Sequence, residues 1–271
     1  MGNNKKENQQ LKEQRLGEIK YNNQGCLMKI IEYNKSTDII VEFQDERKAK
    51  VQTRYNNFER GQVENPFFPS VYGHGILGNE SCSSANTKEY KAWDRMLERC
   101  YSENLLNRRP TYKNVECCDE WLYYPNFYKW LHKQENFDKW FNEDKWAIDK
   151  DILVKGNKIY SPETCCLVPR RVNTLFTKSD SKRGKYPIGV ALKKGKKTNQ
   201  FRAAISKIDE RTGKKIFEHI GYRNTPEQAF LLYKKHKELY IKQVAQEEYS
   251  KGNITKKCYE AMMNYEVEII D

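Results

Sequence analysis

Several polar residues between Asp149 and Asn173 are of types that take part in metal binding and acid–base chemistry. Asp149 and Asn173 offer carboxylate and amide oxygens, which suit a hard cation such as Mg²⁺. Lys150 offers an ammonium group, which stays protonated near neutral pH unless it is strongly desolvated and is therefore a poor general base. Thr164 adds a hydroxyl group. The plain alternative is a hairpin in which the aspartate and the asparagine only cap turns.

These residues lie on a run of short predicted elements. The apolar segment Trp146–Ile148 predicts a strand, Gly156-Asn157 a tight turn, and Ile159-Tyr160 a second strand. The Ser161-Pro-Glu-Thr164 sequence is typical of the start of a helix. The order of these signals predicts a ββα hairpin with Asp149 at the end of its first strand.

The segment from Trp146 to Phe176 resembles the HNH nuclease family, in particular the degenerate HNH-like proteins common in phage genomes. In that family an Asp-His pair ends the first strand, and Asp149-Lys150 stands at that pair. Thr164 stands where the family has an Asn that braces the hairpin, and Asn173 stands at its last position. The resemblance implies catalytic positions at Asp149, Lys150 and Thr164, and Mg²⁺ ligands at Asp149 and Asn173.

Two of the four family positions carry other residues in this chain. Lys150 replaces the histidine that acts as general base, and Thr164 replaces the bracing Asn. One carboxylate alone would hold a divalent ion only weakly. The resemblance therefore implies a retained scaffold whose catalysis is impaired or lost, with Mg²⁺ as a cofactor only if the nuclease site is active. An active, Mg²⁺-dependent HNH-type DNA endonuclease is the alternative.

Upstream of the hairpin, apolar residues recur at helical spacing from Tyr90 to Tyr101, and Thr87 can cap that helix. This helix, and the aromatic blocks that follow it as far as Leu131, resemble the opening of the same phage group. We therefore expect an HNH-like domain over residues 87–177, with most of its aromatic side chains in the core. The short polar run at residues 80–87 predicts the boundary before it.

The N-terminal part is predicted to hold a tail and a small β module. Residues 1–16 are almost all polar and predict a disordered or frayed helical tail. Strands are expected at Cys26–Tyr33, Asp38–Phe43 and Lys48–Thr53. Several short strands within residues 17–80 predict a small, strongly bent β barrel. Such a module would bind nucleic acid or peptide, or serve as a spacer.

Beyond the charged stretch at 178–185, three strands and a helix are predicted. The strands are expected at Pro187–Leu192, Gln200–Ser206 and Lys215–Gly221, and Thr225-Pro226-Glu227 is typical of a helix start. This arrangement resembles the Apetala-type DNA-binding domain, also found in phage integrases and homing endonucleases. The features that match are Gly189-Val190, Phe201-x-Ala203, Gly221 and the Thr225-x-Glu227-x-Ala229 helix start.

That resemblance implies a DNA-binding domain over residues 179–271, whose sheet would lie in the major groove and supply Arg and Lys side chains to bases and phosphates. Strand alternation would place Arg202 on the face opposite Phe201, which packs on the helix. The DNA-binding candidates are Lys193, Lys194, Lys196, Lys197, Arg202, Lys207, Lys214 and Arg223. This lysine-rich set favours contact with phosphates over reading of base sequence. The alternative is a merely solvated sheet.

Composition narrows the class of protein. The 271-residue chain carries 49 Lys and Arg against 37 Asp and Glu, a net charge of +12, which favours a polyanionic partner. No apolar run is long enough to span a bilayer, and a cytoplasmic protein is expected. Its eight cysteines are then expected to be thiols. Without a C-x-x-C motif, zinc is not indicated. One arrangement stays open, in which Cys100, Cys117 or Cys118, and Cys165 or Cys166 converge with His132.

These patterns together predict an α+β protein of several domains: a small N-terminal β barrel, an HNH-like ββα unit with aromatic helices, and a C-terminal three-stranded sheet with a helix. The expected function is double-stranded DNA binding by a phage-type protein related to homing endonucleases, in the host-cell cytoplasm. A different class of function is also open, in which the protein binds and inhibits a host enzyme or defence complex. A host protein would then be its partner. No membrane partner is expected.

Overall fold

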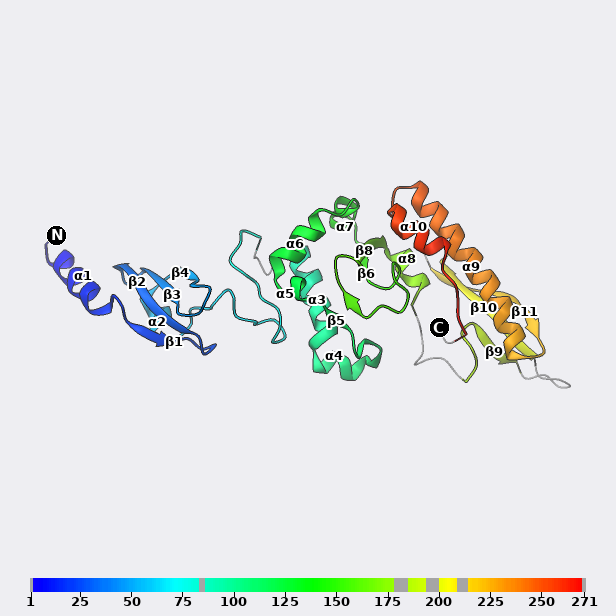
Figure 1. The fold of residues 1–271 in the computed structure, drawn as a ribbon, viewed down its shortest axis with the longest axis horizontal. Coiled ribbons are helices and arrows are strands. Elements are labelled where there is room, and N and C mark those ends of the chain that lie inside the picture. The colour runs from blue at the N-terminus through cyan, green and yellow to red at the C-terminus, as the bar shows by residue number, and fades with distance from the viewer. Residues whose placement is uncertain (1, 83–85, 178–184, 194–199, 209–213, 270–271) are drawn as a thin grey trace. The chain divides into compact units, whose positions relative to one another are not determined.

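The fold is known from a computed structural model that describes residues 2–82, 86–177, 185–193, 200–208 and 214–269 (Figure 1). Its contacts divide the chain into two compact units, Met1–Lys129 and Trp130–Asp271. Each unit combines helices with small antiparallel sheets, so the α+β class predicted from the sequence is confirmed.

The first unit opens with helix α1 (Gly2–Arg15) and a four-stranded antiparallel sheet. The strands, in spatial order, are β1 (Ile19–Tyr21), β2 (Leu27–Lys35), β3 (Asp38–Phe43) and β4 (Lys50–Thr53), and helix α2 (Tyr55–Glu59) follows them. Residues alternate between buried and more exposed along β2 and β3, so one face of the sheet carries the core. Met28, Ile30 and Val41 lie on that face, and Phe58 of α2 packs with them.

The predicted small β barrel is wrong, because this sheet does not close. A barrel closes by pairing its first strand with its last, whereas β1 and β4 are the two edges of this sheet. β1 has three residues and β4 has four, which is too short to curl round and meet. Instead, α2 and Leu11 of α1 pack against the core. The tail at 1–16, predicted to be disordered or a frayed helix, contains α1.

The rest of the first unit is helical and aromatic. Its elements are α3 (Lys88–Tyr101), α4 (Glu103–Arg108), the 3-10 helix η1 (Pro110–Tyr112), β5 (Glu116–Cys117), α5 (Asp119–Leu122) and the start of α6 (Tyr124–His132). The predicted Thr87 cap is confirmed, since its hydroxyl accepts the Tyr90 backbone N–H at 3.1 Å. Trp93 and Trp121 are fully buried, and the Trp93 indole N–H donates to the Trp121 carbonyl. These aromatics form the core, as expected from the sequence.

The second unit continues with α7 (Phe137–Asn142) and the segment predicted to be a ββα hairpin, whose first strand pairs with Cys166–Pro169 and not, as expected, with Ile159-Tyr160. Strand β6 (Trp146–Asp149) pairs antiparallel with β8 (Cys166–Pro169), and the short β7 (Ile159–Tyr160) lies between them in sequence. Helix α8 (Arg170–Leu175) begins only after β8. The helix start predicted at Ser161–Thr164 is therefore wrong: these residues form a turn, in which the Cys165 N–H donates to the Ser161 carbonyl, and the apolar residues after them pair with β6.

The C-terminal sheet has the predicted three strands, β9 (Val190–Lys193), β10 (Gln200–Ile208) and β11 (Lys215–Arg223), with β10 in the centre. Helix α9 (Pro226–Ser250) packs along it, and α10 (Lys256–Met263) follows (Figure 1). The Thr225 cap is confirmed by a 3.2 Å bond from the Gln228 N–H. Gly189 has a positive φ and lies against Tyr233 of α9, where a β-carbon would come within 2.1 Å of the ring. Only glycine fits that position.

One core runs through the second unit. Val168 and Val172, from β8 and α8, belong to the same buried cluster as Ala203 of β10 and Ile241 and Val244 of α9. The cluster therefore joins residues from both sides of the charged stretch at 178–185. The division into separate domains at residues 87–177 and 179–271 stays a prediction. In the described parts of the chain, no helix combines the length and apolar character needed to cross a membrane.

Candidate functional site

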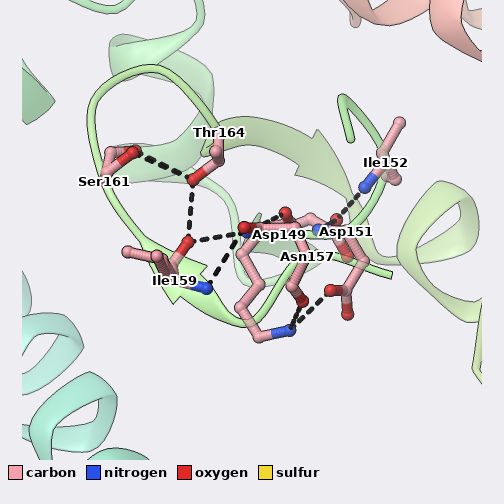
Figure 2. A network of polar contacts seen from close by, with 8 residues as sticks. Asp149, Asp151, Ile152, Asn157, Ile159, Ser161 and Thr164 are labelled. Atoms are coloured by element: carbon pink, nitrogen blue, oxygen red, sulfur yellow. Dashed lines mark hydrogen bonds and ion pairs between the residues drawn. The ribbon is translucent and has the colours of Figure 1, made fainter. Parts of the chain in front are cut away.

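Asp149 lies at the end of β6 and is 7% exposed. Its Oδ1 accepts the backbone N–H groups of Asp151 and Ile152 at 2.7 and 2.8 Å (Figure 2). Burial raises the pKa of this carboxyl from 3.8 to about 6, although the two N–H groups favour the charged form. The side chain therefore holds the loop after β6 in a tight turn.

Lys150 follows Asp149 directly, and its ammonium is committed to the loop. The Nζ atom lies 2.5 Å from Oδ1 of Asp151 and donates to the Asn157 carbonyl at 2.9 Å. The side chain is almost fully buried. A buried ammonium that already has an acidic partner and a carbonyl acceptor is not set up to take a proton from water.

Asn157 and Thr164 close the other side of the same loop (Figure 2). The Asn157 amide donates to the carbonyls of Lys150 and Ile159 at 2.8 and 2.7 Å. The Thr164 hydroxyl also donates to the Ile159 carbonyl, at 2.8 Å, and lies 3.1 Å from the hydroxyl of Ser161. The structure thus brings Asp149, Lys150 and Thr164 into one network, whose bonds fasten the loop to the hairpin.

The oxygens present do not fit a Mg²⁺ site. Asn173 is a half-buried residue of α8, and among the described residues no hydrogen bond joins its side chain to Asp149. Oδ1 of Asp149 already accepts two N–H groups, and the next residue places an ammonium in the loop. Mg²⁺ sites use one or two carboxylates that are open to the ion and its waters. No cluster of three or more His, Cys, Asp or Glu able to hold a metal occurs within the described ranges, and this includes the cysteine and His132 arrangement left open above.

The C-terminal sheet has two unlike faces. Ala203 and Ile205 of β10 are buried against α9, which covers one face. We call the other side the outer face, and it carries Lys193, Gln200, Arg202, Phe217, His219 and Tyr222. Arg202 pairs across the strands with Tyr222, and the Lys193 ammonium lies 3.0 Å from the Tyr222 hydroxyl and 4.8 Å from the centre of its ring. The position expected for Arg202, opposite Phe201, agrees with this register.

The remaining DNA-binding candidates lie elsewhere. The Lys207 ammonium is 2.6 Å from Oε2 of Glu218 and lies over the ring of Tyr240 in α9, so it belongs to the covered face. Arg223 pairs across the strands with Phe201, on the side that packs towards α9, and donates to the Tyr222 carbonyl. Lys214 is exposed just before β11. Lys194, Lys196 and Lys197 fall outside the described residues. Of the DNA-binding candidates that the structure describes, only Lys193 and Arg202 are therefore brought together on the outer face.

Sequence reasoning missed the aromatic part of the outer face. Phe217 is 77% exposed, and the rings of His219 and Tyr222 lie 4.6 Å apart. An apolar strand residue is ordinarily assigned to the core. The signal was available in the pair Ile216-Phe217, because adjacent strand residues point to opposite faces and a single helix covers only one of them.

Comparisons of the chain with models of known protein families, with curated proteins and with solved structures found no match. Function has to be inferred from the residues and their geometry alone.

Proposed function

We propose that this protein binds double-stranded DNA through the outer face of the β9–β10–β11 sheet, and that its HNH-like hairpin is a scaffold without nuclease activity. The observation that carries the proposal is the grouping of Lys193 and Arg202 with three aromatic side chains on one uncovered sheet face. The net charge of +12 also favours binding to a polyanion such as DNA.

The chemistry of this face suits a nucleic-acid backbone. Lys193 has a neutral phenol as its partner, so its charge is not cancelled by the Tyr222 contact. Arg202 is exposed and offers a planar fork of N–H donors, which matches phosphate or a guanine edge. Phe217, His219 and Tyr222 add flat apolar surface that can pack against sugars. A two-stranded ribbon, such as the one that β10 and β11 form, is narrow enough to enter the major groove.

The loss of nuclease activity is proposed from the hairpin. A nuclease of the HNH type needs a base and an open carboxylate, whereas the Lys150 ammonium and Oδ1 of the buried Asp149 are committed to the loop. A plasmid incubated with Mg²⁺ is expected to stay supercoiled. Rapid nicking that is abolished by Asp149→Ala would contradict this part of the proposal and favour the active endonuclease.

The DNA-binding part is tested with a fluorescently labelled duplex of random sequence, titrated at several salt concentrations. Each phosphate contact contributes a slope of about −0.9 in log affinity against log salt. The double variant Lys193→Ala/Arg202→Ala is therefore expected to flatten the slope by up to about two contacts' worth. The matched control is Lys235→Ala/Lys242→Ala, which removes the same charge from exposed positions of α9. If both variants lose affinity equally, the outer face is not the DNA-binding surface.

A second function, binding of a host protein, is favoured by one observation, the 77% exposure of Phe217. Large exposed aromatic residues are enriched at protein–protein interfaces. In that case the folded wild-type protein would show no DNA affinity even at low salt, and the host-protein function would replace the DNA-binding one.

A further inference from the structure

A cavity of about 680 Å³ lies in the second unit beside strand β10. It exists because β9 is shorter than its neighbour: β9 pairs only with Gln200–Ala203, and the later residues of β10 border the cavity. Aromatic side chains from three other segments line it: Phe176, Tyr233, Tyr240 and Tyr265. The volume lies within the range of small-molecule sites in proteins.

The edge of β10 presents a backbone donor to this cavity. The Ala204 N–H bonds to the Gly189 carbonyl at 3.0 Å, and the Ile208 N–H bonds to the Tyr240 hydroxyl at 3.3 Å. Both groups therefore point away from β11. Ser206 lies between them, and since alternate residues of an antiparallel strand direct their N–H groups to the same edge, its N–H points the same way. Ser206 is also one of the cavity-lining residues.

Three lysines line the same cavity, and they differ in whether an acidic side chain pairs with them. Lys207 is paired with Glu218. Lys215 and Lys237 repel one another, and among the described residues no carboxylate forms an ion pair with either. Burial, with the added repulsion from Lys215, lowers the pKa of the half-buried Lys237 to about 8. Two ammonium groups that face one space, with no ion-paired carboxylate in the described part of the chain, are stabilised when an anion enters it.

We propose that this cavity binds a nucleotide, with its phosphate monoester held by Lys237, Lys215 and the Ser206 N–H, and its base packed against the aromatic side chains. Ammonium groups and a backbone N–H are the donors that proteins use for phosphate. Tyrosine and phenylalanine rings provide stacking surface for any base. Arg202 and Phe217 of the outer face also line this cavity, but the proposal does not require that duplex DNA bind the outer face. The nucleotide can be free or can be the 5′-phosphorylated end of a DNA strand.

The test is calorimetric titration of the full chain with deoxyadenosine monophosphate, deoxyadenosine and inorganic phosphate. Wild-type protein is expected to bind the monophosphate at least tenfold more tightly than either of the other two. Lys237→Met is expected to weaken monophosphate binding at least tenfold, because methionine keeps the length of the side chain and removes the charge. Lys242→Met, an exposed position of the same helix, is expected to bind as the wild type does.

The fold is checked by thermal unfolding, and Lys237→Met is expected to unfold at the same temperature or higher, because it removes a desolvated charge. No monophosphate binding by the wild type, or equal binding by Lys237→Met, overturns the proposal. Binding of inorganic phosphate as tight as that of the monophosphate overturns the role of the aromatic walls. Duplexes with 5′-phosphorylated and 5′-hydroxyl ends distinguish the two sources of the nucleotide. If the wild type prefers the phosphorylated ends and Lys237→Met loses this preference, the site binds DNA ends. If the wild type shows no preference, the site binds the free nucleotide.

Discussion

Arg202 and Lys207 belong to the same strand but lie on opposite faces of the sheet. Arg202 pairs with Tyr222 on the outer face, whereas the Lys207 ammonium lies 5.2 Å from the centre of the Tyr240 ring in α9. Their spacing of five residues produces this difference, because strand side chains alternate. The sequence places both residues among the DNA-binding candidates, but only Arg202 lies on the outer face, and Lys207 lies on the face that α9 covers.

The first prediction compares these two residues in DNA binding. Arg202→Ala is expected to flatten the salt slope by about 0.9, one phosphate contact's worth. Lys207→Ala is expected to leave it nearly unchanged, because its charge is paired with Glu218 on the covered face. Anisotropy titrations at four salt concentrations measure both slopes. If the two substitutions changed the slope equally, DNA would not bind the outer face in preference to the covered one.

The second prediction concerns the buried ammonium of Lys150. Lys150→Met removes its bonds to Asp151 and to the Asn157 carbonyl, and is expected to lower the free energy of unfolding by about 1 to 3 kcal/mol. Urea unfolding followed by tryptophan fluorescence measures the change. The control is Lys158→Met, an exposed lysine of the same loop, for which a change within about 0.5 kcal/mol is expected. Equal stability of the two variants would show that the network does not hold the loop.

The third prediction concerns Asp149 and pH. Its pKa is raised to about 6 in the folded chain, so between about pH 4 and pH 6 the folded protein keeps a proton that the unfolded chain has lost. The unfolded state binds fewer protons in that window, and the contribution of Asp149 to the free energy of unfolding therefore falls as pH rises and stays low above pH 6. Asp149→Asn keeps an oxygen for the two backbone N–H groups and removes this loss.

Asp149→Asn is accordingly expected to be more stable than the wild type at pH 7 by about 1 to 3 kcal/mol, and to show no such gain at pH 4. Because other acids titrate in both proteins, the quantity to follow is the difference between their unfolding free energies at each pH. Parallel profiles from pH 4 to pH 7 would contradict the raised pKa. A loss of stability at pH 7 would show that the carboxylate charge itself is needed by the turn.

Local sequence patterns predicted those elements of the fold whose cause is local, and failed where pairing with a distant segment decides the structure. The Thr87 and Thr225 caps and the three C-terminal strands follow from short patterns whose cause is local: a hydroxyl that satisfies a free N–H, and side chains that alternate. The helix start at Ser161 failed for a non-local reason. Its local signature was overridden by the pairing of Cys166–Pro169 with β6, which a single segment cannot reveal.

The candidate site shows the same limit. The resemblance to the HNH family grouped Asp149, Lys150 and Thr164, and the structure does bring them together. What the sequence could not show is that the Lys150 ammonium, Oδ1 of Asp149 and the Thr164 hydroxyl bond to the loop, because their partners are mostly backbone carbonyls and N–H groups. The sequence also could not show which lysines of β10 and α9 are paired or buried, since the pairing of Lys207 and the burial of Lys237 depend on how the helix lies on the sheet.

The last prediction concerns the contact between α8 and α9. Arg171 of α8 donates to Glu248 at 3.1 Å and to Glu247 at 2.7 Å, and Glu248 is only 4% exposed. Removing one partner of a buried ion pair leaves an uncompensated charge, which costs more than the pair itself contributes. Arg171→Met is therefore expected to lower the free energy of unfolding by about 2 to 4 kcal/mol, towards the lower part of the usual range because Arg171 is partly exposed. Arg170→Met, at the exposed neighbouring position, is the control and should change it by less than about 0.5 kcal/mol.

A second variant separates the ion pair from general packing. Adding Glu248→Gln to Arg171→Met removes the stranded charge and keeps an oxygen for the Asn253 amide, which donates to Glu248 at 2.8 Å. The double variant is expected to recover part of the loss, by about 1 to 2 kcal/mol. Full stability of Arg171→Met would mean that α8 is not fastened to α9 by this ion pair. A loss that Glu248→Gln does not reduce would assign the effect to the methylenes of Arg171 and not to its charge.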